Sequence, residues 1–148
     1  LGLCYGLEIL IQSLGEPISH THKEKTGAVD LIITDEGKTD LLLVGLSNPF
    51  RAFVGHKESA ECVPSGGVLL LRSLDCPVHM FRLGQNVYAV QFHPEMDSEA
   101  MCARIDVYKH AGYFPPEKSE SLKKEVRKET ITEPMKILKR FAERYCRQ

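Results

Sequence analysis

The sequence predicts an α/β domain, and three observations support this prediction. Leu7, Leu10, Ile11 and Leu14 recur at helical spacing until Gly15 stops the pattern. Several short apolar segments follow, and glycine-containing turn signals separate them. A second helical pattern begins near residue 97. Helical patterns before and after a group of strand patterns indicate a mixed α/β architecture.

The expected elements follow one another along the chain. The first helix covers the apolar pattern that Gly15 ends. Strands are expected near residues 29–34, 50–55, 68–72, 78–83 and 86–92. Asp97 or Ser98 is expected to cap a helix that ends near Gly112 and carries Met101, Ile105 and Tyr108 on one face.

The C-terminal segment differs in charge from the rest of the chain. Residues 117–148 contain ten Lys or Arg and six Asp or Glu. A basic segment can bind nucleic acid or a membrane surface, but Leu138, Phe141, Ala142 and Tyr145 form a helical stripe whose opposite face must be solvated. We therefore expect residues 113–148 to be a helical extension packed on residues 1–112, with no nucleic-acid or membrane partner.

Composition indicates an ordinary cytoplasmic protein. The chain is 43% hydrophobic with a formal net charge of −1, which indicates neither disorder nor a nucleic-acid footprint. Its five cysteines show no C-x-x-C spacing, so reduced thiols are expected rather than a zinc site or a disulfide framework. His20 and His22 have no third ligand at a recognisable spacing. No metal and no cofactor are expected.

A candidate nucleophile lies near the start of the chain, within Gly2-Leu3-Cys4-Tyr5-Gly6. This is a cysteine version of the G-x-S-x-G turn, in which a strand passes sharply into a helix. The turn places the Cys4 sulfur at a helix N-terminus, which favours thiolate over thiol. The backbone N–H of Tyr5 is then a natural oxyanion donor.

A candidate base follows the last expected strand, within Gln91-Phe92-His93-Pro94-Glu95. A nucleophilic thiol needs a base, and the base needs a group that fixes its orientation. His93 and Glu95 supply these two roles, and they lie at the carboxyl end of a strand, where open α/β sheets bind ligands. The sequence therefore predicts a catalytic triad of Cys4, His93 and Glu95.

The spacing of these two motifs, with Gly55-His56-Lys57-Glu58 between them, resembles class I glutamine amidotransferase domains, and most of all the free-standing GMP-synthase-like type. The resemblance covers nearly the whole chain. It implies part of an open, mostly parallel twisted sheet flanked by helices, with flavodoxin-like layering. It also implies that the segment formed by Gly55, His56, Lys57 and Glu58 helps to bind the amino-acid end of glutamine.

Members of this family carry several strand and helix units before the nucleophile, together with a loop that gives the second oxyanion donor. We therefore expect this chain to be the C-terminal part of a domain of roughly 230 residues, inactive and poorly folded alone. A short, complete protein is the alternative.

The resemblance implies that Cys4 attacks the side-chain amide of glutamine, that a γ-glutamyl thioester forms, and that ammonia passes to an unidentified acceptor or synthetase partner. Glu8 departs from the family, which commonly has Gln there. Its carboxylate opposes the thiolate and repels the substrate's carboxylate, yet it can bind the substrate's ammonium group. Two alternatives stay open: a hydrolase of other γ-glutamyl compounds, and a catalytically weakened binding or regulatory domain.

Overall fold

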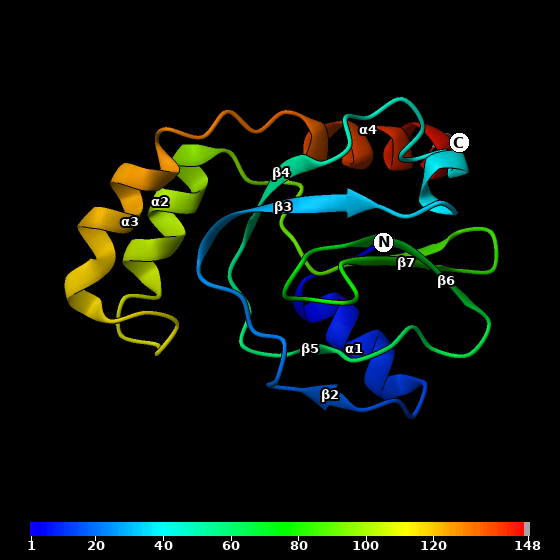
Figure 1. Cartoon of the computed structure of the whole chain (residues 1–148), viewed down its shortest axis with the longest axis horizontal. Helices are drawn as coiled ribbons and strands as arrows, with labels where there is room; N and C mark the ends of the chain where they lie inside the picture. The colour runs from blue at the N-terminus through cyan, green and yellow to red at the C-terminus, as the bar shows by residue number, and fades with distance from the viewer. Residues whose placement is uncertain (147–148) are drawn as a thin grey trace.

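The computed structural model describes residues 1–146, which form a six-stranded sheet, a two-stranded sheet and four α-helices (Figure 1). The strands are β1 (Gly2–Leu3), β2 (Ile18–Ser19), β3 (Gly27–Ile33), β4 (Phe50–Val54), β5 (Ser59–Ala60), β6 (Gly67–Arg72), β7 (Met80–Leu83) and β8 (Val87–Val90). The helices are α1 (Tyr5–Ser13), α2 (Ser98–Val107), α3 (Ser119–Val126) and α4 (Glu133–Tyr145), and short 3-10 turns cover Gly37–Thr39 and Pro116–Lys118.

The main sheet has the strand order β1-β8-β7-β6-β3-β4. The expected α/β class, with helices flanking a sheet, is confirmed, but the sheet is mixed rather than mostly parallel over residues 1–146. β1 pairs with β8 in parallel, and each of the other neighbouring pairs is antiparallel. The turn at residues 84–86 explains one of these pairs, because a connection this short can join only antiparallel strands.

Helices α1 and α4 cover opposite faces of the sheet. Neighbouring residues of one strand point to opposite faces, and on β7 Phe81 joins the cluster beneath α1 whereas Met80 joins the cluster beneath α4. Leu7 and Ile11 supply the buried face of α1, and Ile137 supplies that of α4. The two helices therefore close two separate apolar layers around the sheet (Figure 1).

Helices α2 and α3 pack together at the end of the molecule beyond β3 and β4 (Figure 1). Phe53 of β4 joins Met101 and Ile105 of α2 and Leu122 of α3 in a third apolar cluster. Asp97 caps α2, because its side chain accepts a hydrogen bond of 2.8 Å from the Ala100 N–H. The expected cap is therefore confirmed.

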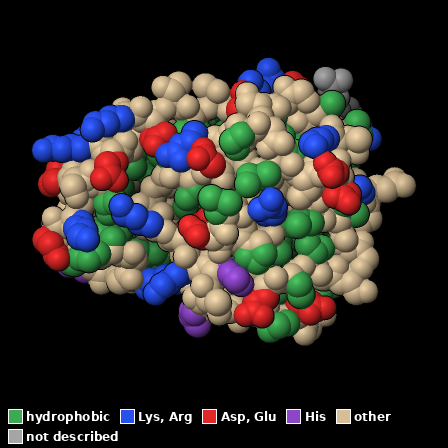
Figure 2. Space-filling model, in the orientation of Figure 1, with side chains coloured by type: hydrophobic (Ala, Val, Ile, Leu, Met, Phe, Trp, Pro, Cys, Tyr) green, Lys and Arg blue, Asp and Glu red, His purple; other side chains and the backbone are tan. Residues whose placement is uncertain are grey.

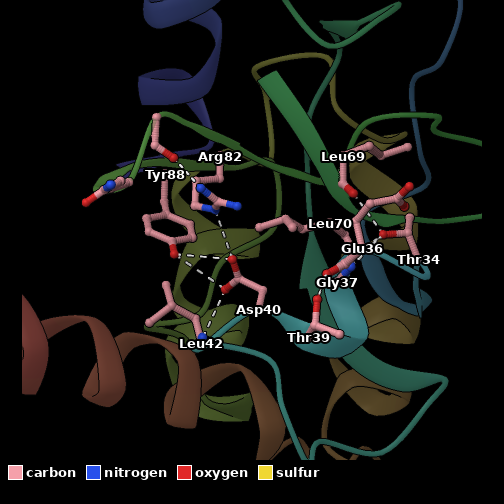
Figure 3. A network of polar contacts seen from close by, with 12 residues as sticks. Thr34, Glu36, Gly37, Thr39, Asp40, Leu42, Leu69, Leu70, Arg82 and Tyr88 are labelled. Atoms are coloured by element: carbon pink, nitrogen blue, oxygen red, sulfur yellow. Dashed lines mark hydrogen bonds and ion pairs between the residues drawn. The ribbon is translucent and has the colours of Figure 1, made fainter. Parts of the chain in front are cut away.

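A polar network fixes the loop between β3 and β4 against the sheet (Figure 3). Asp40 is buried and accepts hydrogen bonds from Arg82 Nε at 3.1 Å and from the Leu42 N–H at 3.0 Å. Thr34 donates to the Leu69 carbonyl at 2.8 Å. The loop can thus carry Leu42 into the core while its polar groups stay satisfied.

The C-terminal helices pack on the rest of the chain, α3 against α2 and β3, and α4 against β4. The buried face of α4 centres on Ile137, whereas Ala142 is exposed, so the predicted apolar stripe is wrong at that position. A division at residue 112 stays a prediction. On the face shown in Figure 2, Lys and Arg side chains over the α2–α3 end alternate with Asp and Glu. Within residues 1–146, none of the helices combines the length and the apolar character that crossing a bilayer requires.

Candidate active site

The turn at Cys4 joins β1 to α1 with an unusual backbone conformation. Cys4 has φ 48° and ψ −101°. Among residues 1–146 it is the one residue other than glycine that has a positive φ. A Cβ atom on Gly2 would lie 2.9 Å from the backbone C and O of Gly6, whereas a Cβ atom on Gly6 would meet nothing within 4 Å. The turn therefore requires glycine at position 2, where the backbone passes close to the start of the helix, and not at position 6.

The Cys4 side chain is buried, and the pKa of its thiol is raised to about 11. Burial is the largest cause of the raised pKa and the nearby Glu8 carboxylate the second. The positive charge of Arg104 lowers the pKa, as do hydrogen bonds to the sulfur from the Tyr5 N–H and the Gln91 amide. The prediction that the helix N-terminus makes Cys4 a thiolate is therefore wrong for this structure, because burial and Glu8 outweigh the favourable groups. The thiol needs a base that removes its proton.

His93 has the arrangement of such a base. Its Nδ1 lies 2.7 Å from Glu95 Oε1, and its backbone N–H donates to the Phe53 carbonyl at 3.0 Å. The contact with Glu95 places the ring proton on Nδ1, which leaves Nε2 with a free lone pair. Nε2 is buried and makes no hydrogen bond within residues 1–146.

Glu95 is ionised in this arrangement. Burial alone would raise the pKa of its carboxyl group, but the His93 hydrogen bond reverses the effect and the net pKa is lowered. A carboxylate at this position can hold the His93 ring and stabilise its protonated form.

A cavity of about 520 Å³ connects the candidate residues. Eight of the residues that the sequence predicted line it: Cys4, Tyr5, Glu8, Gly55, His56, Lys57, Glu58 and His93. Glu95 lies behind His93 instead of in the wall. Five further residues complete the lining: Leu3, His20, Arg104, Tyr108 and Tyr113.

The segment from Gly55 to Glu58 follows β4 and forms one wall of the cavity. The His56 side chain is fully buried, and its Nε2 contacts Glu24 at 2.9 Å. Lys57 lies over the Tyr113 ring, with Nζ 4.5 Å from the ring centroid, and donates to the Ala111 carbonyl. The His56 side chain therefore points to the buried Glu24, and Lys57 is held at the cavity rim, while the part of this segment in substrate binding stays a prediction.

Glu8 lies on the first turn of α1 and is 7% exposed. Its Oε1 accepts from Gln91 Nε2 at 3.4 Å. The pKa of its carboxyl group is raised, first by burial and further by Glu58, against the opposing effects of Gln91 and His56. A buried carboxylate beside the thiol is thus a real feature of the site.

Arg104 and Tyr108 were not predicted as site residues. Arg104 lies over the Tyr108 ring, 4.7 Å from its centroid, and both line the cavity. Tyr108 was expected on the apolar face of the preceding helix, but it follows the end of α2 and is 36% exposed. The i, i+4 spacing of the two residues is the sequence signal for this pair. Arg104 brings a positive charge to a cavity that Lys57, Glu8 and Glu58 also line.

Side chains able to bind a metal come together behind this wall, and His56 is the member of the group that also lines the cavity. Glu24, His56, Cys76 and His79 are buried, and one ligand atom from each lies within 4.8 Å of the others. His20, by contrast, is exposed and pairs with Glu58 at 3.3 Å.

The fold and this cavity define an α/β protein with a cysteine on a strand-to-helix turn, and comparison with known proteins gives the family. The model of the family "Glutamine amidotransferase class-I" matches residues 1–105. The chain therefore belongs to the class I glutamine amidotransferase family, as the sequence motifs predicted.

Relatives agree with this membership, and a solved structure shares the fold. The chain is 33% identical over 106 residues to a GMP synthase [glutamine-hydrolyzing] of Thermosipho melanesiensis, a match covering 71% of this chain and 20% of the relative. A Borreliella burgdorferi protein of the same name is 31% identical over 96 residues, which is 65% of this chain and 18% of that protein. The chain thus spans about a fifth of these curated relatives. A glutamine amidotransferase structure from Thermotoga maritima shares the fold with a TM-score of 0.74 at 20% identity, over 96% of this chain and 60% of that one.

Proposed function

We propose that this chain carries the glutamine-hydrolysing site of an amidotransferase. One observation supports the proposal above the others: Cys4, on a strained turn, and His93, held by Glu95, line the same cavity. A thiol, a base with a free Nε2 and an orienting carboxylate are the groups that covalent amide hydrolysis needs.

In the first half of the reaction His93 Nε2 takes the proton of the Cys4 thiol as the sulfur attacks the side-chain amide carbon of glutamine. The Tyr5 N–H stabilises the oxyanion that forms. The C–N bond then breaks, and the nitrogen leaves as ammonia with the proton that His93 returns. A γ-glutamyl thioester remains on Cys4.

In the second half His93 takes a proton from water, and the resulting hydroxide attacks the thioester carbon. The C–S bond breaks, the sulfur regains its proton from His93, and glutamate leaves. Glu95 keeps the His93 ring in one orientation through both halves and transfers no proton.

Arg104 is the group in the cavity best suited to the α-carboxylate of glutamine, because a guanidinium binds a carboxylate through two parallel hydrogen bonds. Glu8 and Glu58 line the same cavity and offer partners for the α-ammonium group. The GMP synthases to which the chain is similar suggest that the ammonia passes to a synthetase partner in the cytoplasm. The acceptor itself is not identified.

The proposal is tested by glutaminase assays on the purified protein that contains this chain. Cys4→Ser and His93→Ala should remove nearly all hydrolysis, whereas Glu95→Gln should leave a partial rate because Glu95 only orients. Cys102→Ala serves as the control, because this cysteine packs between α2 and α3. Wild-type turnover in His93→Ala would refute the proposed base.

Glu8 favours a second candidate, a domain that acts on another γ-glutamyl compound or has weakened catalysis. The carboxylate raises the pKa of the Cys4 thiol and occupies the place where the family commonly has Gln. If it only hinders catalysis, Glu8→Gln should raise kcat/KM for glutamine. A fall in kcat/KM for glutamine would assign Glu8 to substrate recognition.

A further inference from the structure

A cluster of four metal-binding side chains lies behind the cavity wall, built from three separate segments. Its members, named here the Glu–His–Cys–His cluster, are Glu24, His56, Cys76 and His79. Glu24 precedes β3, His56 follows β4, and the other two form a C-x-x-H pair just before β7. Relative exposure does not exceed 8% for any of the four residues.

Two imidazole nitrogens of the cluster face one carboxylate oxygen. His56 Nε2 lies 2.9 Å and His79 Nε2 2.7 Å from Glu24 Oε2. The other ring nitrogen of His56, Nδ1, lies 2.9 Å from the Glu58 carbonyl oxygen. A carbonyl oxygen can only accept, so this Nδ1 carries a proton, and Nε2 is the ring nitrogen that faces the carboxylate.

Two ring nitrogens around one buried carboxylate oxygen form a geometry that suits a metal ion. A metal-binding histidine typically donates the N–H of one ring nitrogen to a backbone carbonyl and turns the other ring nitrogen toward the metal. The carbonyl fixes the tautomer. His79 adds an unsatisfied ring, since both Nδ1 and Nε2 are buried and neither has a hydrogen-bond partner of acceptable geometry within residues 1–146.

Cys76 completes the ligand set with a sulfur atom. Its side chain is fully buried, and its Sγ contacts the Val78 carbonyl at a long 3.6 Å. Ser73 supports the cluster from outside, because its Oγ donates to Glu24 Oε1 and accepts from the Cys76 N–H at 2.9 Å. Such outer contacts hold ligands in position before a metal arrives.

We propose that a zinc ion binds at this cluster as a structural metal. Two imidazoles, one thiolate and one carboxylate are ligands that tetrahedral zinc accepts, and a closed set of four is typical of structural sites. Tetrahedral bonds of about 2.0–2.3 Å separate neighbouring ligand atoms by roughly 3.5 Å, so the two nitrogens must move outward slightly. Binding of the ion displaces the thiol proton of Cys76 to solvent.

The zinc ion would fix the cavity wall without taking part in the reaction. His56 lies between Gly55 and Lys57, which both line the cavity. Anchoring its ring holds this wall to the segments before β3 and before β7. The ligands come from segments up to 55 residues apart, from Glu24 to His79, so C-x-x-C spacing does not reveal them.

The experiment is metal binding by the purified protein, measured independently of glutamine hydrolysis. After equilibration with zinc sulfate and desalting, elemental analysis should find one zinc ion per chain. Cobalt(II) in place of zinc should give the visible bands of a tetrahedral site and a near-ultraviolet thiolate-to-cobalt band. The cobalt measurement uses the wild-type protein, so the proposal stays testable even if variants fold poorly.

Variants then assign the ligands. Cys76→Ala should abolish the thiolate-to-cobalt band. His79→Gln, which keeps a donor toward Glu24, should weaken zinc binding by more than the roughly 10–100-fold that loss of an outer partner costs. Ser73→Ala, which removes an outer partner, should weaken zinc binding by an amount within that range. Cys4→Ala and Cys102→Ala are matched controls and should bind zinc normally.

The proposal is overturned if the wild-type protein retains no zinc or gives no thiolate-to-cobalt band. It is equally overturned if Cys4→Ala, and not Cys76→Ala, removes the metal, because the ion would then belong to the cavity. Failure of the proposed glutaminase activity would leave the zinc result unchanged, so the two proposals are separable.

Discussion

Cys4 combines two properties that oppose each other at the scale of one residue. Its positive φ is a strained conformation for a residue other than glycine, and such strain is characteristic of functional sites. Its burial and the neighbouring Glu8 raise the pKa of the thiol. The residue is therefore placed for attack but protonated, and the account gives His93 the task of removing the proton.

The glycine requirement at the turn gives the first prediction. Gly2→Ala should destabilise the protein by about 1–3 kcal/mol, because the new Cβ meets backbone atoms of Gly6 that cannot move aside easily. Gly6→Ala is the matched control and should be neutral or stabilising by up to ~1 kcal/mol, since it adds alanine to a helix at an open position. Urea unfolding measures both. Equal stability of the two variants would contradict the described turn.

The effect of Glu8 on the thiol gives the second prediction. The alkylation rate of Cys4 by iodoacetamide should rise with pH beyond pH 10 in the wild-type protein, because the thiol pKa is about 11 and the thiolate is the nucleophile. Glu8→Gln removes a negative charge, which lowers this pKa and shifts the profile to lower pH. Glu36→Gln, on an exposed turn, should leave it unchanged. A Glu8→Gln profile identical to that of the wild type would contradict the electrostatic coupling.

At the scale of elements, the sequence predicted the helix ends and strand positions that depend on residues close together in the chain. Gly15 ends α1, Asp97 caps α2, and the strands of the main sheet from β3 to β8 overlap their predicted ranges. The short pair of β2 and β5 was not predicted, because strands of two residues have no periodicity to detect. The direction of strand pairing was also misjudged. The short turn at residues 84–86 implies the antiparallel β7–β8 pair, whereas the antiparallel β3–β6 pair joins segments that are far apart in the chain.

The same distinction separates the site residues that were predicted from those that were missed. Cys4, His93 and Glu95 belong to compact motifs whose backbone geometry is local. Arg104 reaches the cavity only because α2 packs beside β4 through Phe53, a contact between residues far apart in the chain. The spacing of residues within one segment does not predict a contact of this kind.

The cap of α2 gives the third prediction, because this helix carries Arg104. Asp97→Ala removes the acceptor of the Ala100 N–H and should cost about 1 kcal/mol of unfolding free energy. Asp97→Asn should restore most of this loss, since asparagine also caps helices well. Thermal unfolding of the three proteins checks the order. An Asp97→Ala variant as stable as the wild type would show that the cap is unimportant.

At the scale of the whole molecule, the two edges of the main sheet differ. β4 forms one edge and contacts α4, whereas β1 forms the other and has β8 as its neighbour. Tyr5 and Ile9, on the helix that follows β1, are 67% and 51% exposed. An edge strand beside exposed apolar side chains invites association.

The fourth prediction follows from this edge. The 148 residues expressed alone should self-associate, and size-exclusion chromatography with light scattering should detect species larger than a monomer. Ile9→Lys should reduce this association, whereas Leu74→Lys, an exposed apolar residue on the loop between β6 and β7, is the control. A chain that stays monomeric would contradict this prediction.

The most direct measurement of the central claim is covalent trapping of the nucleophile. A glutamine analogue that carries an electrophile at the side-chain carbonyl position is incubated with the full protein, and peptide mass spectrometry then locates the adduct. We predict labelling of Cys4 that excess glutamine prevents and that His93→Ala slows strongly. Cys62 and Cys146 are exposed and report on unspecific alkylation. Labelling of either one ahead of Cys4 would contradict the assignment of the active site.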